Sequence, residues 1–156
     1  MDLIIKKIID KKEKEIISKE VLYDLPEWFG LPESTEEYIK DSQDKPFLAC
    51  YADNDVAGFI VLNATSKDTA DIFVMGIKKK FHRMGIGTKL NTEFENMAKN
   101  LGYSYSQVKT VKMGHYKEYD ITNEFYIAMG YKELECFPTL WDEWNPCQIY
   151  IKYLGE

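Results

Sequence analysis

The stretch FVMGIKKKFHRMGIGTKL, residues 73–90, decides how this sequence folds. An apolar segment of strand character leads through a patch of cations to Gly85 and Gly87. From Ile86 the apolar residues recur at helical spacing, and Gly102 stands where a helix C-cap is expected. The stretch therefore predicts a strand, a glycine-rich turn and a helix in immediate succession.

The charge of this turn is opposite to the charge of the whole chain. The 156 residues carry a formal net charge of −6, with an isoelectric point of about 5.1. No acid lies between Asp71 and Glu93, whereas five cations do: Lys78, Lys79, Lys80, Arg83 and Lys89. A glycine-rich turn that opens a helix directs free backbone N–H groups and the positive end of the helix dipole at one place. We expect an anion site there, most naturally for a phosphate group; a solvated basic turn is the alternative.

Two other phosphate-binding motifs do not fit the turn. The Rossmann fingerprint requires a third glycine where Leu90 stands, and a Walker loop requires a Gly-Lys-Ser/Thr ending that is missing. Binding to nucleic acid is also disfavoured, because contact with a phosphate backbone requires a net basic surface.

Length and composition predict one domain over residues 1–156, able to bury roughly 70% of the surface of its unfolded chain. Cys50, Cys136 and Cys147 are odd in number and form no C-x-x-C pair, so neither a disulfide framework nor a zinc site is expected. With His115 in a polar loop and only one other histidine, we expect no metal. The chain shows neither a signal-peptide pattern nor a membrane span, and we expect a cytoplasmic protein.

Periodicity predicts an order of mixed strands and helices. A strand is expected in residues 3–9, followed by a helix that carries Ile16, Ile17, Val21 and Leu25. Ser34 and Glu37 have the spacing of a capping box for a short helix that reaches about Asp44. The later elements are strands at 47–52, 56–64 and 70–77, a helix at 86–101, a strand at 103–111, a short helix at 121–129 and a closing strand pair at 131–137 and 147–154.

HRMGIGTKL resembles the loop that binds the acyl-CoA pyrophosphate in the GNAT superfamily of N-acetyltransferases, with His82 where the family usually has arginine or glutamine. NEFYIAMGY is similar to the family's Phe-Tyr-x-x-x-Gly-Phe/Tyr element. The strings LPEWFGLPES, VMGI, YDITNEFY and LWDEWNPC resemble a bacterial subgroup of small GNAT enzymes, so the resemblance covers nearly the whole chain. It implies a single α/β (α+β) domain with a mixed, mostly antiparallel sheet of about seven strands, about four helices and a splayed strand pair that holds acyl-CoA.

The resemblance implies an N-acetyltransferase that moves the acetyl group of acetyl-CoA to a primary amine by direct transfer in a ternary complex. The amine would belong to an unidentified small molecule or peptide. The backbone of Met75 and Ile77 would pair with the pantetheine arm as an added strand would, and an N–H near Met75 would stabilise the oxyanion. The cofactor-binding residues implied are Met75, Gly76, Ile77, His82, Arg83, Met84, Gly85, Ile86, Gly87, Thr88 and Asn123.

The resemblance also implies a catalytic residue, Tyr126, as the proton donor to the leaving CoA thiolate; a packing tyrosine is the alternative. Trp28, Phe29 and Glu33 are the candidate acceptor-binding residues, and the acids around them indicate a positively charged amine. The general base stays open among Glu27, Glu33, Asp120 and a water chain. Trp141 and Trp144 could also line an acceptor pocket.

Two other classes of function compete with the enzyme. One is a non-catalytic acyl-CoA-binding or sensing module, in which the loop is intact but the acceptor side is not. The other is a regulatory domain that binds a different phosphate ligand. The expected partners are an amine substrate and, as one possibility, a second copy of the chain, without nucleic acid or membrane.

Overall fold

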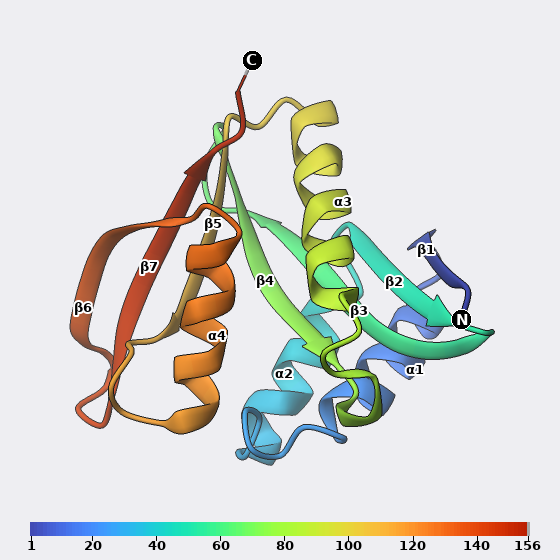
Figure 1. Cartoon of the computed structure of the whole chain (residues 1–156), viewed down its shortest axis with the longest axis horizontal. Coiled ribbons are helices and arrows are strands. Elements are labelled where there is room, and N and C mark those ends of the chain that lie inside the picture. Colours follow the sequence, from blue (N-terminus) through green and yellow to red (C-terminus); the bar gives the residue numbers. More distant parts are fainter. Residues whose placement is uncertain (156) are drawn as a thin grey trace. The chain divides into compact units, whose positions relative to one another are not determined.

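The computed structural model describes residues 1–155, in which seven strands form one sheet in the order β1-β2-β3-β4-β5-β7-β6 (Figure 1). The strands are β1 (Leu3–Ile8), β2 (Phe47–Ala52), β3 (Asp55–Ala64), β4 (Thr69–Ile77), β5 (Tyr105–Val111), β6 (Lys132–Asp142) and β7 (Asn145–Tyr153). The helices are α1 (Lys11–Leu22), α2 (Pro32–Ser42), α3 (Ile86–Asn100) and α4 (Lys117–Ala128), with a 3-10 turn η1 (Lys79–Phe81). The expected α/β architecture of seven strands and four helices is confirmed.

The chain forms two compact units. The first holds residues 1–63 and 72–97, and the second holds residues 64–71 and the chain from Ala98 onward. The loop singled out in the sequence therefore lies wholly within the first unit, and Tyr126 lies in the second. The expectation of one domain over residues 1–156 stays a prediction.

Alternating apolar residues in the first unit bury both faces of its strands. Ile17, Val21 and Leu22 of α1 and Ile39 of α2 pack with Phe47, Ala49, Phe59, Val61 and Val74 in one buried cluster. The intervening residues Leu48, Cys50, Ile60 and Leu62 are also buried and point to the opposite face, because successive side chains in a strand alternate. Helix α3 crosses that face in Figure 1 and buries Ile86, Leu90 and Phe94. Helices α1 and α2 therefore pack on one face of these strands, and α3 packs on the other.

Two expectations for the first two helices were wrong. The capping box is absent, because α2 begins at Pro32 and Ser34 lies inside its first turn. Proline favours that first helical position because its fixed φ suits a helix and its missing N–H has no partner to lose. Ile16 is 55% exposed although it fits the apolar pattern of α1, and Leu25 is buried beyond the end of the helix, where its N–H donates to the carbonyl of Leu22.

The second unit is an antiparallel ladder in which β7 pairs with β5 on one side and β6 on the other. The β6–β7 hairpin is longer than expected, because Asp142 accepts hydrogen bonds from the backbone N–H groups of Trp144 and Asn145 and so closes a tight turn. Helix α4 begins at Lys117 rather than Ile121, since Glu118 and Asp120 in its first turn suit the positive end of the helix dipole.

Candidate functional site

The connection from β4 to α3 is a tight, internally bonded turn. The N–H of Lys78 donates to the carbonyl of Ala57 on β3, and the N–H groups of Phe81 and His82 donate to the carbonyls of Lys78 and Lys79. Phe81 is buried and anchors the turn to the core of the first unit. These contacts fix the position of residues 78–82, which precede the polar part of the loop.

After His82 the backbone enters the left-handed region of φ and, in the described part of the chain, no longer forms internal hydrogen bonds before α3. Arg83 and Gly85 have φ values of +65° and +77°, in the left-handed region. The first hydrogen bond of α3 runs from the N–H of Lys89 to the carbonyl of Gly85, at 3.1 Å. Within residues 1–155, the amides from Arg83 to Thr88 therefore make no hydrogen bond. Successive N–H groups in such a turn form a concave anion site, and the dipole of α3 adds positive potential.

His82 ties the loop to the end of β4. Its Nε2 lies 2.6 Å from the carbonyl oxygen of Ile77, so the ring donates there when Nε2 carries the proton. The ring also meets Trp28 edge-on, with the centroids 5.9 Å apart. The histidine side chain therefore connects the loop to the end of β4 and to Trp28. The cofactor contact implied for His82 stays a prediction.

The cations of the loop divide into paired and unpaired groups. Lys78 forms an ion pair with Glu20, and its side chain is only 15% exposed. Lys79 pairs with Glu27 at 3.0 Å, and its N–H donates to Asp24. The hydrogen bond from Lys79 lowers the pKa of Glu27, which makes this carboxylate a weaker general base.

Arg83, Lys89 and Lys80 remain exposed. The ammonium of Lys80 lies 5.1 Å from the centroid of the Phe81 ring. Arg83 and Lys89 are therefore the side chains best able to add charge to the backbone site. Among the described residues no ion pair of either side chain with an acid is found.

The end of β4 presents different residues to its two faces. A Cβ at Gly76 would meet Val21 at 3.0 Å and Leu25 at 3.2 Å, so this glycine lets α1 approach the strand. Met75 and Ile77 lie on the opposite face and are half-buried. Packing thus accounts for the small size of Gly76, whereas the cofactor role of all three residues stays a prediction.

In the second unit, Tyr126 is almost completely buried on α4, with an exposed fraction of 3%. Its ring meets Phe125 and Tyr131 at centroid distances of 5.1 and 5.5 Å. Burial raises the pKa of Tyr126 well above its ordinary value, and the nearby Tyr131 and Asp71 add to that rise. The phenol therefore stays protonated, and it can donate a hydrogen bond more readily than it can give up its proton.

Asp71 is a buried carboxylate that the sequence pattern did not single out. It lies near the start of β4, accepts a hydrogen bond from Gln107 at 3.0 Å and is 3.8 Å from the ammonium of Lys109. Burial raises the pKa of Asp71, although both partners act in the opposite direction. The sequence ADIFV could have identified Asp71. An acid inside an apolar strand requires either a hydrogen-bonding or charged partner in the fold or a functional role.

Asn123 is fully buried and its side chain is occupied inside the fold. Its amide nitrogen donates to the carbonyls of Val111 and Tyr119 at 2.8 and 2.6 Å, and its oxygen accepts from the hydroxyl of Tyr150 at 2.6 Å. These contacts fasten α4 to β5 and β7. They favour a structural role, and the cofactor contact expected for Asn123 stays a prediction.

The expected acceptor residues lie in the first unit. Trp28 and Phe29 are half-buried against the core of this unit. The Phe29 ring contacts the Tyr38 ring edge-on, and the Tyr38 ring makes a second edge-on contact with Phe73 on β4. Glu33 is exposed in the first turn of α2. The structure brings Trp28 to the loop through His82, while Glu33 has no such link among the described residues.

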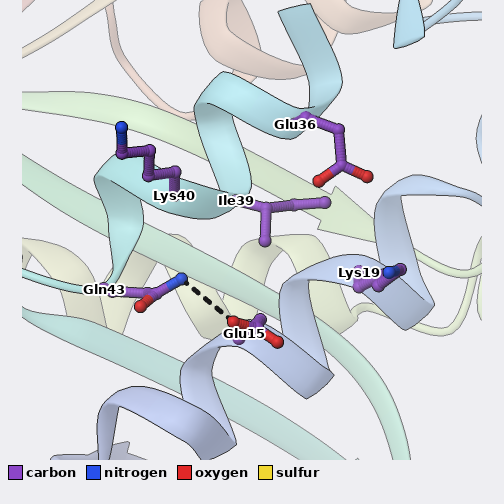
Figure 2. Close-up of a pocket in the computed structure, with 6 residues that line it drawn as sticks. All are labelled: Glu15, Lys19, Glu36, Ile39, Lys40 and Gln43. Carbon is purple, nitrogen blue, oxygen red and sulfur yellow. Dashed lines mark hydrogen bonds between the residues drawn. The ribbon is translucent and has the colours of Figure 1, made fainter. Parts of the chain in front are cut away.

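Two shallow hollows border α2. One, of about 280 Å³, lies between α1 and α2 and is lined by Glu15, Lys19, Glu36, Ile39, Lys40 and Gln43 (Figure 2). Its charges alternate in sign, and the amide of Gln43 donates to Glu15 across it, so it selects no ligand class. The other, of about 230 Å³, is lined by Ser34, Glu37, Tyr38, Asp41 and Phe73.

No cluster of His, Cys, Asp and Glu in residues 1–155 could hold a metal ion. All three cysteines are free thiols, and burial raises the pKa of Cys147 to about 11. Asp120 accepts a hydrogen bond from the N–H of Gly114 and stabilises the loop before α4. In the same part of the chain, no helix combines the length and the apolar character needed to cross a membrane.

The family model described as "Acetyltransferase (GNAT) family" matches residues 18–131, so the chain belongs to this family of acetyltransferases. A search of curated protein sequences found no match. Solved structures share the fold at low identity. Ard1 from Thermoplasma volcanium is 17% identical with a TM-score of 0.77, and each chain is covered completely.

Two further similar structures are an enzyme of stated activity and a complex with acetyl-CoA. An aminoglycoside 6′-N-acetyltransferase from Enterococcus faecium is 18% identical, with a TM-score of 0.76 and 98% of each chain covered. A GNAT family acetyltransferase from Elizabethkingia anophelis, solved with acetyl-CoA bound, is 15% identical, with a TM-score of 0.72 and 97% of each chain covered. At these identities the likeness establishes the fold.

Proposed function

We propose that the chain is an acetyl-CoA-dependent N-acetyltransferase that acts on a primary amine. The observation that carries the proposal is the run of unpaired amides from Arg83 to Thr88 at the positive end of α3, in a chain of the GNAT acetyltransferase family. These donors fit a pyrophosphate, which offers several acceptor oxygens and negative charge. Related structures that hold acetyl-CoA or CoA support this choice of acyl donor.

The reaction is a direct transfer in a ternary complex. The amine nitrogen attacks the thioester carbonyl, the new C–N bond forms, and the C–S bond breaks as the thiolate leaves. The nitrogen loses a proton to a base or to water. Met75 and Ile77 at the end of β4 would align the pantetheine arm, and the backbone N–H near Met75 would stabilise the charge that develops on the carbonyl oxygen.

Tyr126 would assist the departing thiolate by donating a hydrogen bond. Because burial raises the pKa of Tyr126, complete proton transfer to a thiolate, whose own pKa is ~8.5, would be unfavourable. A hydrogen bond to a charged acceptor requires no such transfer. Tyr126→Phe should lower the single-turnover rate roughly 10- to 150-fold and leave CoA binding unchanged. An unchanged rate would leave Tyr126 as a packing residue.

The acceptor amine belongs to a small molecule or peptide. Neighbours in structure include aminoglycoside acetyltransferases, so aminoglycosides join polyamines and peptides as test substrates.

Exposed apolar side chains of the β6–β7 hairpin, among them Leu140, Trp141 and Trp144, support a homodimer. Light scattering of the purified chain would test the dimer, and cell fractionation would test the cytoplasmic location.

The experiment that tests the function combines thiol release with product mass. The full chain is incubated with acetyl-CoA and each amine of the panel, free CoA is measured over time, and the product is weighed. Amine-dependent CoA release with a matching acetylated product is expected. CoA binding without turnover on any amine would favour the acyl-CoA-binding module instead. A thermal shift with other nucleotides and none with CoA would favour the regulatory domain.

A further inference from the structure

We propose that the imidazole of His82 occupies the end of β4 in the free protein and that the pantetheine arm of acyl-CoA displaces it. The occupied group is the carbonyl oxygen of Ile77, which lies 2.6 Å from Nε2 of His82. This inference rests on the proposed function, because it describes how the cofactor of that reaction enters its site. His82 then acts on the arm of the cofactor, separately from the amides that are proposed to hold the pyrophosphate.

The surroundings of β4 show to which side the backbone of Ile77 points. The N–H of Lys78 donates to the carbonyl of Ala57 on β3, at 2.9 Å. The carbonyl oxygen of Gly76 lies near β3 as well, because a Cβ at Gly58 would be 2.7 Å from it. Backbone groups of successive residues in a strand point to opposite sides, so those of Ile77 point away from β3. The proposed function assigns this side of the strand to the pantetheine arm.

His82 already fills the place that an amide of the arm would take. An N–H group that pairs with a strand lies about 2.9 Å from the carbonyl oxygen that accepts its hydrogen bond. The ring nitrogen of His82 lies at such a distance from Ile77. Because a carbonyl oxygen only accepts, Nε2 carries the proton in this contact and donates the hydrogen bond. An arm that pairs with Ile77 therefore takes over the position of the imidazole.

The backbone of His82 is fixed, whereas its ring can leave. The N–H of His82 donates to the carbonyl of Lys79 at 3.1 Å, and the preceding Phe81 is buried. Besides Ile77, the ring contacts Trp28 edge-on, with the centroids 5.9 Å apart. His82 itself is only half-buried. Rotation about its side-chain bonds can thus release the carbonyl while the loop keeps its place.

The displacement makes two parts of the cofactor behave differently. ADP has a pyrophosphate and no arm, so it can bind the amides from Arg83 to Thr88 and leave His82 in place. CoA gains the carbonyl of Ile77 only at the loss of the hydrogen bond from His82. The ring therefore lowers the affinity for CoA but not for ADP, and after the transfer it competes with the arm of the CoA product.

The first test follows the His82 ring by nitrogen NMR of the isotope-labelled full chain at mildly alkaline pH. His115 is the only other histidine and is exposed, so His115→Ala leaves one imidazole to observe. In the free protein, Nε2 should be the protonated nitrogen of the neutral ring, and its proton should be shifted downfield by the hydrogen bond. Saturating CoA should abolish this downfield shift, whereas saturating ADP should preserve it.

The second test compares affinities by calorimetry. His82→Phe keeps an aromatic ring beside Trp28 and removes the hydrogen-bond donor. The ratio of CoA affinity to ADP affinity should rise roughly 2- to 10-fold in this variant. Damage to the loop would instead weaken both ligands, because both use the amides that follow residue 82. His115→Phe is the matched control and should leave both affinities unchanged.

An Nε2 proton signal that saturating CoA leaves unchanged would overturn the inference, because His82 would then keep the carbonyl of Ile77. A free neutral ring protonated at Nδ1 would also overturn it, as would an affinity ratio that His82→Phe does not raise. The proposed function fails separately, if no amine supports CoA release while CoA displaces His82 as expected.

Discussion

A carboxylate introduced at Gly85 should separate the phosphate-binding role of the loop from its role in the fold. Gly85 directly precedes α3, has a φ of +77°, is exposed, and has no atom within 4 Å of the position that a Cβ would take. Gly85→Asp therefore adds backbone strain and a negative charge but no steric clash. Gly85→Asn has nearly the same shape and tolerates positive φ equally well, so the comparison of the two isolates the charge.

The magnitude follows from Coulomb's law. A unit charge about 4 Å from one phosphate charge costs ~1 kcal/mol in bulk water and ~4 kcal/mol at the effective dielectric of a protein surface. Gly85→Asp should therefore bind CoA roughly 5-fold to several hundredfold more weakly than Gly85→Asn. The same carboxylate should stabilise the ligand-free protein by ~0.3–1 kcal/mol, because it lies at the positive end of the α3 dipole. Stability and affinity should thus move in opposite directions.

Calorimetry with CoA and urea denaturation of the same preparations would measure both quantities. Gly102→Asp is the matched control. This residue, just beyond the other end of α3, also has a positive φ, of +95°, and open space around the position of a Cβ. It should leave CoA affinity unchanged. If Gly85→Asp and Gly85→Asn bind CoA equally well, the loop does not hold the pyrophosphate.

Three further substitutions test individual contacts. Gly76→Val should destabilise the protein by about 1–3 kcal/mol in urea denaturation, more than Gly76→Ala, because the added atoms overlap α1. Asn123→Ala should cost ~2–5 kcal/mol, with Tyr150→Phe less severe, since the alanine leaves buried carbonyls unpaired; loss of CoA affinity at normal stability would indicate a cofactor contact instead. Asp71→Asn should gain stability relative to the wild type as pH rises above ~3.9, because the raised pKa of the native carboxyl makes its ionisation unfavourable; parallel pH profiles would contradict this.

The order of elements was predictable because the strongest sequence signals are local. Period-two strands, the amphipathic pattern from Ile86 and the cap at Gly102 each depend on neighbouring residues, and all three reappear in the structure. The boundaries of α2 and α4 were less predictable. At Ser34 a capping signal competes with Pro32 two residues earlier, and the proline decides where the helix starts.

The backbone of the candidate site could be inferred from sequence, whereas its supporting contacts could not. Two glycines at the start of a helix predict free N–H groups, and the unpaired amides from Arg83 to Thr88 agree with that. The ion pair of Lys78 with Glu20 and the contact of His82 with Ile77 join the loop to its surroundings. The partners of such contacts are set by tertiary packing, which periodicity does not report.

The buried polar groups of the second unit were the least predictable part. Asp71 is a polar interruption in an apolar strand, and Asn123 was expected to contact the cofactor. Both are buried because β5 and β7 supply partners such as Gln107 and Tyr150, which lie 27 or more residues away in sequence. The sequence can indicate such a network only through a polar residue at a position of a helix or strand where the pattern predicts an apolar one.

The account depends most on acetyl-CoA binding through the backbone of the loop after β4. The direct measurement is an NMR titration of the isotope-labelled chain with CoA, in which each backbone amide reports separately. The amides from Arg83 to Thr88 should show the largest downfield shifts, because they gain hydrogen bonds to phosphate oxygens that they lack in the free protein. If CoA binds and these amides do not move, the pyrophosphate lies elsewhere and the proposed site is wrong.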